Sequence, residues 1–519
     1  MKVALTINDH LHRAEDLFAH RIAVVDEPDQ PAPNWGTFTY GEMADRARAM
    51  AAGLDALGLA PGERIAMVSH NSARLLTAFF GVSGSGRILV PVNFRLVAEE
   101  VQYIVEHSGA RVLLVDPELA DAMAGVRCER KLIIGTEADN EMMRFGVEPR
   151  PWTADEDATA TINYTSGTTA RPKGVQLTHR NLWLNSAVFG WQLGVNDRDV
   201  YLHTLPQFHC NGWGVLYAVT GMGAKHVILR KVDGAEILRR VEREGVTLLC
   251  GAPAVANMIL DAAQTWDGPI PGRDRVRMVV AGAPPPTKTI ERIETELGWE
   301  FIQIYGLTET TPLLTMNRRT AETDALTPAA RAAKLSRAGG AALGVRMRIS
   351  SQGEVLARGN HIMGGYWSQP DATADAIKPA GDDTGGPEWF HTGDGGTIDD
   401  EHYVTISDRK KDVIISGGEN VSSIEVEDAL FSHPEVTEVA VIGVPDEKWG
   451  ELVLGLVVRA PGSTLTEDEL IAYCKTKLAG YKCPKRIEFR EALARTATGK
   501  LQKFKLREPY WQGLTRQVN

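Results

Sequence analysis

The sequence predicts an α/β protein with a large N-terminal domain and a small α+β domain at the C-terminus. Three observations support this prediction. Short apolar segments alternate with segments of helical periodicity over about the first 315 residues, a pattern typical of parallel βαβ units with helices on both faces of a sheet. Glycine-rich, β-like segments replace this alternation from about residue 335. Helices and strands then mix to the end of the chain, over a length sufficient for an independent small domain.

The first third is predicted to form one doubly wound α/β subdomain. Apolar residues at Met43, Ala47, Ala51 and Leu54 follow helical spacing within 40–57, which indicates a helix. The expected order after it is strand 64–69, helix 74–83, strand 88–92, helix 98–107 and strand 111–116. Residues 120–157 show little periodicity and are predicted to be rich in loops.

A second doubly wound α/β subdomain is predicted over roughly 180–315, and a small β subdomain after it. The expected elements are helix 181–193, strands 201–205 and 225–229, helix 235–244, and strands 247–250, 276–281 and 301–305. The β subdomain starts near residue 335 with strands 345–349 and 354–358, and 382–386 is predicted to be a surface loop. The two α/β halves are expected to be similar, but no sequence repeat proves an internal duplication.

A highly charged segment marks the predicted domain boundary. Residues 407–412 read SDRKKD, and we place the boundary at Asp408. The N-terminal domain then spans residues 1–407 and the C-terminal domain residues 408–519. Within the latter, helices are expected over 424–432 and 467–478, and strands over 438–444 and 452–459.

Composition excludes several classes of protein. A hydrophobic content of 43% and a charged content of 24% are typical of a soluble globular protein. The net charge of −11 argues against a general nucleic-acid or anionic-membrane surface. The five cysteines are scattered without CxxC spacing, which favours reduced thiols over disulfides or a zinc site. No signal peptide and no apolar window of about 18 residues is evident, so a cytoplasmic protein without stable membrane insertion is expected.

The stretch 164–175, YTSGTTARPKGV, is the central motif. Its first six residues are glycine or carry hydroxyl groups, and Lys173 adds a compact positive charge. Such a loop can surround phosphates with backbone N–H groups and short donors. The flanking segments predict a hairpin-like connection between two strands. The loop is not a Walker A motif, because Pro172 stands where that pattern requires glycine.

This stretch resembles the phosphate-binding signature of the adenylate-forming superfamily, which includes acyl-CoA synthetases, nonribosomal peptide adenylation domains and luciferases. The resemblance is strongest to fatty-acid:CoA ligases, in particular the medium- and long-chain fatty-acyl-CoA synthetases. It covers essentially the whole chain, because further family motifs follow in the family's order. They are GAP at 282–284, YGLTET at 305–310, FHTGD at 390–394 and TATGK at 496–500. One departure is Ala494, where many relatives have proline.

The resemblance implies an ATP and Mg²⁺ site. Tyr305 is expected to stack on adenine, Thr308 to donate to the α-phosphate, and Glu309, with Thr165, to hold Mg²⁺. Asp394 and Arg409 are expected to contact the ribose. The full set implied to bind ATP or CoA is Thr165, Ser166, Gly167, Thr168, Thr169, Lys173, Gly282, Ala283, Pro284, Tyr305, Gly306, Thr308, Asp394, Arg409, Gly417 and Gly418.

The resemblance also implies an acid site and a catalytic lysine. His209 is expected beside the reacting carboxylate and Trp213 at the mouth of the acyl tunnel. A metal cluster of His203, His209 and Cys210 is the alternative, but its spacing matches no common zinc pattern. Gly417 and Gly418 would admit the pantetheine arm of CoA. Lys500 would stabilise the negative charge that develops on the reacting oxygens. The implied catalytic set is Lys500, Thr165, His209 and Glu309.

The resemblance therefore implies ATP-dependent conversion of a carboxylic acid to an acyl-adenylate, then transfer to the thiol of coenzyme A. The family rotates its small domain between the two steps, so the C-terminal domain is expected to be mobile. A carrier-protein thiol is an alternative acceptor. A kinase is disfavoured because the Walker A motif is missing, and a silent binding protein because five charged site residues are present: Lys173, Glu309, Asp394, Arg409 and Lys500.

The identity of the acid stays open between aliphatic, aryl and polycyclic classes. Trp183, Trp191 and Trp213 can line an acyl pocket or belong to the core. Nothing in the sequence reports the oligomeric state, although a homodimer is compatible with a protein of this kind.

Overall fold

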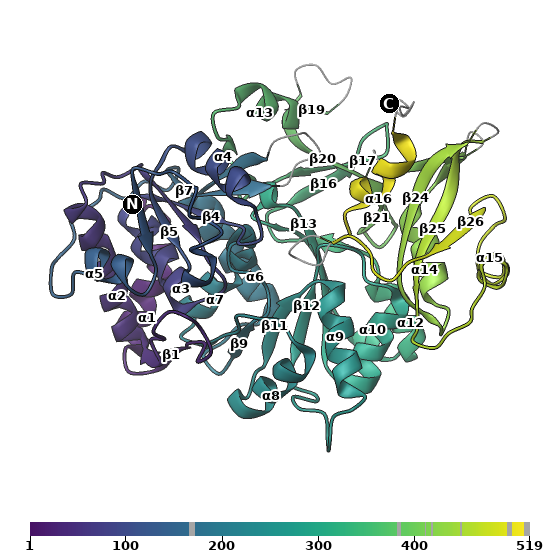
Figure 1. Cartoon of the computed structure of the whole chain (residues 1–519), viewed down its shortest axis with the longest axis horizontal. Coiled ribbons are helices and arrows are strands. Elements are labelled where there is room, and N and C mark those ends of the chain that lie inside the picture. The colour runs from purple at the N-terminus through teal and green to yellow at the C-terminus, as the bar shows by residue number, and fades with distance from the viewer. Residues whose placement is uncertain are drawn as a thin grey trace.

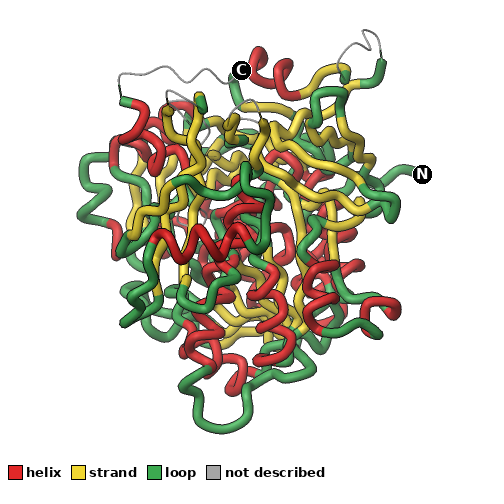
Figure 2. The backbone as a smooth tube through the Cα atoms, turned by 90° about the vertical axis from the view of Figure 1, so that its right-hand side faces the viewer, coloured by secondary structure: helices red, strands yellow, loops and turns green. Residues whose placement is uncertain are grey.

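Figure 1 shows the computed structural model of the chain, which describes residues 1–165, 172–380, 386–409, 412–416, 419–446, 449–495 and 501–512. Over these residues the fold is α/β, with three sheets of seven, fourteen and five strands. The first sheet lies at the left of Figure 1, the second passes through the lower centre, and the C-terminal sheet stands at the right. Seen from the side, strands run through the interior and helices lie outside them (Figure 2).

The first sheet confirms the predicted βαβ units. Its strand order is β18-β8-β7-β4-β3-β5-β6. The parallel strands β3 (Arg64–Val68), β4 (Ile88–Val92) and β5 (Ala110–Val115) are connected by α3 (Ala73–Gly81) and α4 (Ala98–Ser108). The helix predicted over 40–57 is α2 (Tyr40–Ala56), which begins with a capping box between Thr39 and Glu42.

The segment predicted to be rich in loops contains two further elements. These are β6 (Arg130–Ile133), which pairs in parallel with β5, and α5 (Glu137–Met142). Outside these two elements residues 120–157 contain no helix or strand, so the prediction of a segment rich in loops is confirmed. β6 and α5 were missed because they are short and partly exposed, so few of their residues show a period.

The hairpin predicted around the phosphate motif is confirmed. Strands β7 (Thr159–Thr165) and β8 (Lys173–Thr178) are antiparallel, and Thr165 is the register partner of Lys173. A short strand from much later in the chain, β18 (Gly365–Tyr366), pairs with β8 at the edge of this sheet.

The second sheet has a parallel centre made of the predicted strands. In spatial order these are β10 (Lys225–Ile228), β9 (Val200–His203), β11 (Leu248–Gly251), β12 (Arg277–Val280) and β13 (Glu300–Gly306). The strands β1 (Ile22–Val25) and β2 (Thr37–Thr39) extend one edge, beside β10. Helices packed around these strands include α6 (His179–Leu193), α7 (Val215–Gly221), α8 (Gly234–Glu244), α9 (Pro253–Ala263) and α10 (Thr287–Arg292).

The strands of the predicted β subdomain extend this second sheet and do not form a sheet of their own. The connection runs antiparallel from β13 through β14 (Leu313–Asn317) and β15 (Gly339–Ala341) to β21 (Tyr403–Arg409). Beyond β21 lie β20 (Glu388–Ile398), β17 (Glu354–Arg358) and β16 (Arg346–Ile349), and β19 (Ile377–Pro379) pairs with β20. The predicted loop 382–386 lies largely outside the described residues.

The C-terminal part forms a separate small sheet with its own core. Strands β24 (Val436–Asp446) and β25 (Gly450–Arg459) form a long antiparallel pair, and β22 (Ile414–Ser416), β23 (Glu419–Val421) and β26 (Arg486–Phe489) complete the sheet. Helices α14 (Ser423–Phe431), α15 (Glu467–Lys475) and α16 (Lys503–Trp511) pack on it, the first two through buried Val426, Leu430 and Leu470. No described helix is both long enough and apolar enough to cross a bilayer.

Candidate active site

Tyr366 brings together two residues that the sequence motifs place far apart. The Tyr366 hydroxyl donates a hydrogen bond of 2.9 Å to Oε1 of Glu309. The Nζ atom of Lys173 lies 4.7 Å from the centre of the Tyr366 ring, close enough for a cation–π interaction. The end of the β7–β8 hairpin and the Glu309 segment therefore face one site.

Tyr366 was not predicted from the sequence, and its environment suits a hydrogen-bond donor. Burial, and secondarily the Glu309 carboxylate, raises the pKa of Tyr366 well above its usual value. The phenol therefore stays protonated and orients Glu309. The available signal was the sequence Gly364-Gly365-Tyr366-Trp367, in which two glycines precede two aromatic residues.

The turn that carries Thr308 and Glu309 requires a glycine before it. Residues 308–310 form a short 3₁₀ turn directly after β13. A Cβ atom on Gly306 would lie 1.6 Å from the carbonyl oxygen of Pro312, so no other residue fits without rearrangement. The buried Thr310 closes the turn by accepting a hydrogen bond of 2.9 Å from the Leu307 amide.

Tyr305 and Asp394, predicted to contact adenine and ribose, are in direct contact. The Tyr305 hydroxyl donates to Oδ2 of Asp394 at 2.7 Å. Asp394 is 6% exposed, and its amide donates to Thr392 Oγ1 at 3.1 Å. Arg409 is the register partner of Asp394 across β20 and β21; its side chain lies outside the described residues.

The predicted adenine-side loop lies next to this pair. Residues Gly282, Ala283 and Pro284 follow β12, and β12 runs parallel to β13, so both loops leave the same edge of the sheet. Gly282 has a φ of +91° and open space around the position of a Cβ atom. The loop therefore combines a backbone conformation that favours glycine with room for a flat group.

The segment around His209 forms an unusual left-handed turn. Residues Cys210 to Trp213 have φ between 47° and 59° within the 3₁₀ segment His209–Gly214, which we call the 209–214 turn. His209 is half-buried, whereas Trp213 is 4% exposed and packs in an apolar cluster with Cys210 and Ile304. Burial, and secondarily the Glu309 carboxylate, raises the pKa of the Cys210 thiol, which is therefore unsuited to act as a nucleophile.

His203 does not join His209 and Cys210 in a metal cluster. Its Nε2 is 3.1 Å from Nδ1 of His226, and its Nδ1 is 3.2 Å from Nε2 of Gln207. Burial lowers the pKa of His203 well below its usual value and that of His226 to about 3. Within the described ranges, no group of three or more His, Cys, Asp or Glu side chains is arranged to hold a metal.

Two residues of α4, which no sequence motif indicated, support the phosphate hairpin. The Tyr164 hydroxyl lies 2.8 Å from Nδ1 of His107. The Tyr103 hydroxyl donates to the carbonyl oxygen of Pro172 at 3.3 Å, and its ring stacks on His107. Several predicted site residues lie outside the described residues: Ser166, Gly167, Thr168, Thr169, Gly417, Gly418 and Lys500.

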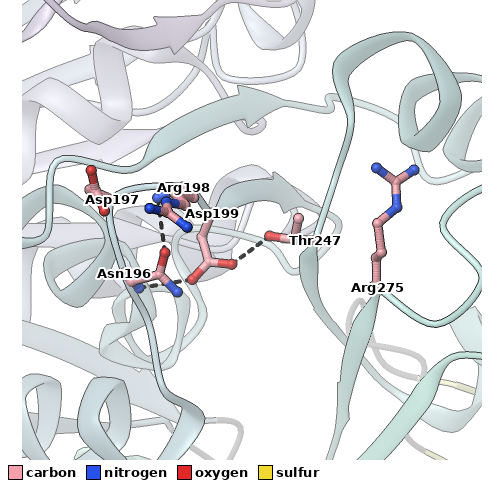
Figure 3. A pocket seen from close by; sticks show the side chains of 6 residues that line it. All are labelled: Asn196, Asp197, Arg198, Asp199, Thr247 and Arg275. Carbon is pink, nitrogen blue, oxygen red and sulfur yellow. Dashed lines mark hydrogen bonds between the residues drawn. The ribbon is translucent and has the colours of Figure 1, made fainter.

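A separate hollow of about 530 Å³ lies away from these motifs (Figure 3). Its lining residues are Asn196, Asp197, Arg198, Asp199, Thr247 and Arg275. They lie near the amino ends of β9 and β11, whereas ligands of α/β sheets bind at the carboxyl ends of strands. Asp199 is already bonded to Thr247 Oγ1 at 2.6 Å and to Arg277, so we assign no chemistry to this hollow.

Comparison with known proteins gives similarities over nearly the whole chain. Residues 11–367 match the family described as AMP-binding enzyme, and residues 425–500 match the AMP-binding enzyme C-terminal domain. The chain is 36% identical to 4-hydroxybutyrate–CoA ligase 2 of Metallosphaera sedula, over 96% of this chain and 93% of that protein. It is 34% identical to 2-methylpropanoate–CoA ligase CCL4 of Humulus lupulus, over 91% and 90% of the two chains.

Solved structures of similar proteins have the same fold. The anthranilate CoA ligase AuaEII in complex with anthranoyl-AMP is 25% identical, with a TM-score of 0.86 over 98% of each chain. A fatty acyl CoA synthetase of Mycobacterium tuberculosis is 31% identical, with a TM-score of 0.72 over 98% of this chain and 99% of that one.

Proposed function

The chain belongs to the AMP-binding enzyme family and is an AMP-forming acyl-CoA ligase, and we propose that its acid is a short, apolar carboxylic acid bound beside the 209–214 turn. The reaction has two steps. The carboxylate attacks the α-phosphate of ATP, which forms an acyl-adenylate and releases pyrophosphate. The thiolate of coenzyme A then attacks the acyl carbon, which forms the thioester and releases AMP.

In this proposal, the nucleotide lies across the contacts described above. Its phosphates face the end of the β7–β8 hairpin, where Lys173 is opposite Thr165. Asp394 accepts hydrogen bonds from the ribose hydroxyls, and its bond from Tyr305 holds the carboxylate in place. Adenine lies between Tyr305 and the open loop at Gly282.

Mg²⁺ would be held by Glu309 together with phosphate oxygens. A hard divalent cation at a nucleotide commonly takes one or two protein carboxylates, with phosphate and water completing its ligands. The Glu309 carboxylate, oriented by Tyr366 near Lys173, fits such a site. The ion neutralises phosphate charge when bound, and Thr165 at the hairpin end is the second candidate ligand.

The observation that carries the choice of acid is the packing below the 209–214 turn. Trp213, Cys210 and Ile304 are each at most 4% exposed and belong to one apolar cluster. A long acyl chain would have to displace this cluster, at a cost of about 25 cal/mol for each Å² of apolar surface exposed. A short chain needs only local adjustment, and two of the four similar proteins named above, 4-hydroxybutyrate–CoA ligase 2 and 2-methylpropanoate–CoA ligase CCL4, have a four-carbon acid in their names.

The C-terminal domain supplies the remaining residues in this proposal. Lys500 acts in the first step, and Gly417 and Gly418 line the path of the CoA thiol in the second. We place the hinge at Asp408, between domains of residues 1–407 and 408–519. Transfer to a carrier-protein thiol, a cytoplasmic location and assembly as a homodimer stay predictions.

The test is acid-dependent ATP–pyrophosphate exchange over aliphatic acids of two to sixteen carbons and a set of aryl acids, with thioester products identified by mass spectrometry. We expect the highest kcat/KM between three and six carbons. Trp213→Ala should shift the optimum to longer acids, whereas Trp191→Ala should not, because Trp191 is 70% exposed on α6. A wild-type optimum at twelve or more carbons would overturn the proposed acid.

A further inference from the structure

We propose that three buried asparagines, Asn163, Asn185 and Asn211, hold the 209–214 turn between the two ATP-binding segments and thereby position the acid for attack on the α-phosphate. This inference rests on the proposed function, which places the acid at this turn. The three side chains are positioning residues, because none of them is assigned a contact with ATP or the acid.

The first connection joins the turn to the strand that leads into the phosphate motif. Asn163 on β7 donates through Nδ2 to Oδ1 of Asn211 at 3.0 Å and to the carbonyl oxygen of Phe208 at 3.2 Å. Asn211 donates to Thr161 Oγ1 at 2.9 Å, and Thr161 donates to Asn163 Oδ1 at 2.9 Å. The side chains of Thr161, Asn163 and Asn211 form a closed ring of hydrogen bonds. Asn163 lies two residues before Thr165.

The second connection joins the other end of the turn to the Glu309 segment. Asn185 on α6 donates to the carbonyl oxygen of Trp213 at 3.1 Å and accepts from the amide of Leu313 at 3.1 Å. Leu313 begins β14, four residues after Glu309. A Cβ atom on Gly214 would lie 2.4 Å from Asn185 Nδ2, so glycine permits this close approach.

The turn needs such support because its backbone conformation is unfavourable. Cys210 and Trp213 have φ of 47° and 59°, a region that residues with a Cβ atom rarely adopt. Asn211, with φ of 51°, is better suited to it than most residues. Strained backbone of this kind persists only where the surrounding contacts over-determine it.

Burial makes these hydrogen bonds effective constraints. Asn163, Asn185, Asn211 and Thr161 are at most 2% exposed. A buried amide that loses its partner cannot bond to water instead, so the network resists displacement of the turn. Because the rate of attack falls steeply with misplacement of the reacting groups, loosening the turn should lower the rate of adenylation more than it lowers ATP binding.

The test compares Asn211→Gly, Asn163→Asp and Asn163→Ala with the control Asn317→Ala. Glycine at 211 keeps the left-handed conformation accessible and removes only the amide. Asn317 is a matched control, since it is 3% exposed and donates at 2.9 Å to two carbonyl oxygens, those of Lys334 and Arg337, away from the turn. The measurements are single-turnover acyl-adenylate formation, the Kd for ATP by calorimetry, and Tm.

We expect Asn211→Gly and Asn163→Ala to lower the adenylation rate at least 30-fold, with the Kd for ATP changed less than threefold and the control rate changed less than threefold. Asn163→Asp adds a pH readout. A carboxylate at 163 repels the two acceptor oxygens that Asn163 serves, whereas the protonated form, which burial favours, can donate to one of them. The adenylation rate of Asn163→Asp relative to wild type should therefore rise as the pH is lowered from 8 to 6. The relative rate of Asn163→Ala should not.

Unchanged adenylation in folded Asn211→Gly would overturn the proposal, and so would an equal loss in Asn317→Ala. The assay uses whichever acid supports exchange by the wild type, so an error in the proposed chain length does not affect it. If Trp213→Ala leaves the preference among acids unchanged, the acid does not bind beside the turn, and the proposed function itself is overturned.

Discussion

The site in the N-terminal part and the C-terminal domain are held in place by different kinds of contact. Around the site, buried side chains join distant segments, as in the bond of Asn163 to Asn211. Among the described residues, contacts of the C-terminal domain with the rest include partly exposed groups: Asp428 accepts from the amide of Thr287 at 2.9 Å, and Ser422 donates to the Ser407 carbonyl.

This difference leads us to expect that the C-terminal domain, and not the N-terminal site, moves. Buried hydrogen bonds are costly to break, because the separated groups find no water. Exposed bonds exchange readily with water and stabilise little. A rigid N-terminal site and a lightly attached C-terminal domain suit an enzyme whose small domain rotates between two chemical steps.

The largest effect is expected from the lysine of the C-terminal domain, which we assign to the first step and not to the second. We predict that Lys500→Ala lowers acyl-adenylate formation by about 10²–10³-fold, the loss typical of removing one group that stabilises transition-state charge. Thioester formation from supplied acyl-adenylate should change less than about threefold. Rapid-quench measurement of each half-reaction checks this, and an equal loss in both steps would contradict the assigned role.

A smaller effect is expected from the partly buried contact between Tyr305 and Asp394. Asp394→Asn removes a charged acceptor for the ribose, and we expect the KM for ATP to rise about 10–100-fold, the effect of losing a hydrogen bond to a charged group. Tyr305→Phe serves as the matched control, because it removes the hydroxyl that donates to Asp394 at 2.7 Å but keeps the ring. Its KM should rise less than tenfold; a larger rise than in Asp394→Asn would show that the hydroxyl matters more than the carboxylate.

Low pH should destabilise the N-terminal part more than the C-terminal domain. Burial lowers the pKa of His10 and His179 to about 4 and that of His226 to about 3, and all three lie in the N-terminal part. Their neutral forms are favoured by folding. The unfolded chain therefore binds more protons below pH 6.5, and the stability contribution present above that pH is lost as the pH falls toward 4.

The expected slope is at most about 1.4 kcal/mol per pH unit for each of these histidines. Urea titrations at pH 7, 6 and 5, followed by hydrogen exchange, should show the N-terminal part losing stability before the C-terminal domain. His226→Asn should reduce the slope. Parallel loss of protection in both regions would contradict the separation.

The smallest effect concerns the exposed contact between domains. Asp428→Ala removes the acceptor at the start of α10, and we expect less than about 1 kcal/mol of lost stability, as for an exposed cap. The ratio of the two half-reaction rates should change less than about threefold. A tenfold change in that ratio, measured by the same rapid-quench assays, would show that this contact controls the domain rotation.

Local signals predicted most elements of the fold, whereas the roles assigned to the site residues stay predictions. The hairpin around residues 164–175 is confirmed because hydroxyl- and glycine-rich sequence between two apolar runs has few alternatives. The prediction failed where elements are short, as at β6 and α5. It also missed that the strands of the β subdomain extend the second sheet, because edge pairing leaves no mark on a strand's own sequence.

The sequence by itself determined the order of the motifs, the chemistry each can offer and the glycine at 306 that its turn requires. Only the tertiary structure decided that Tyr366 connects Lys173 to Glu309, and that Asn163, Asn185 and Asn211 meet the 209–214 turn. The physical reason is range. Backbone sterics and periodicity act over a few residues, whereas these contacts join segments that the chain path brings together through strand pairing and helix packing.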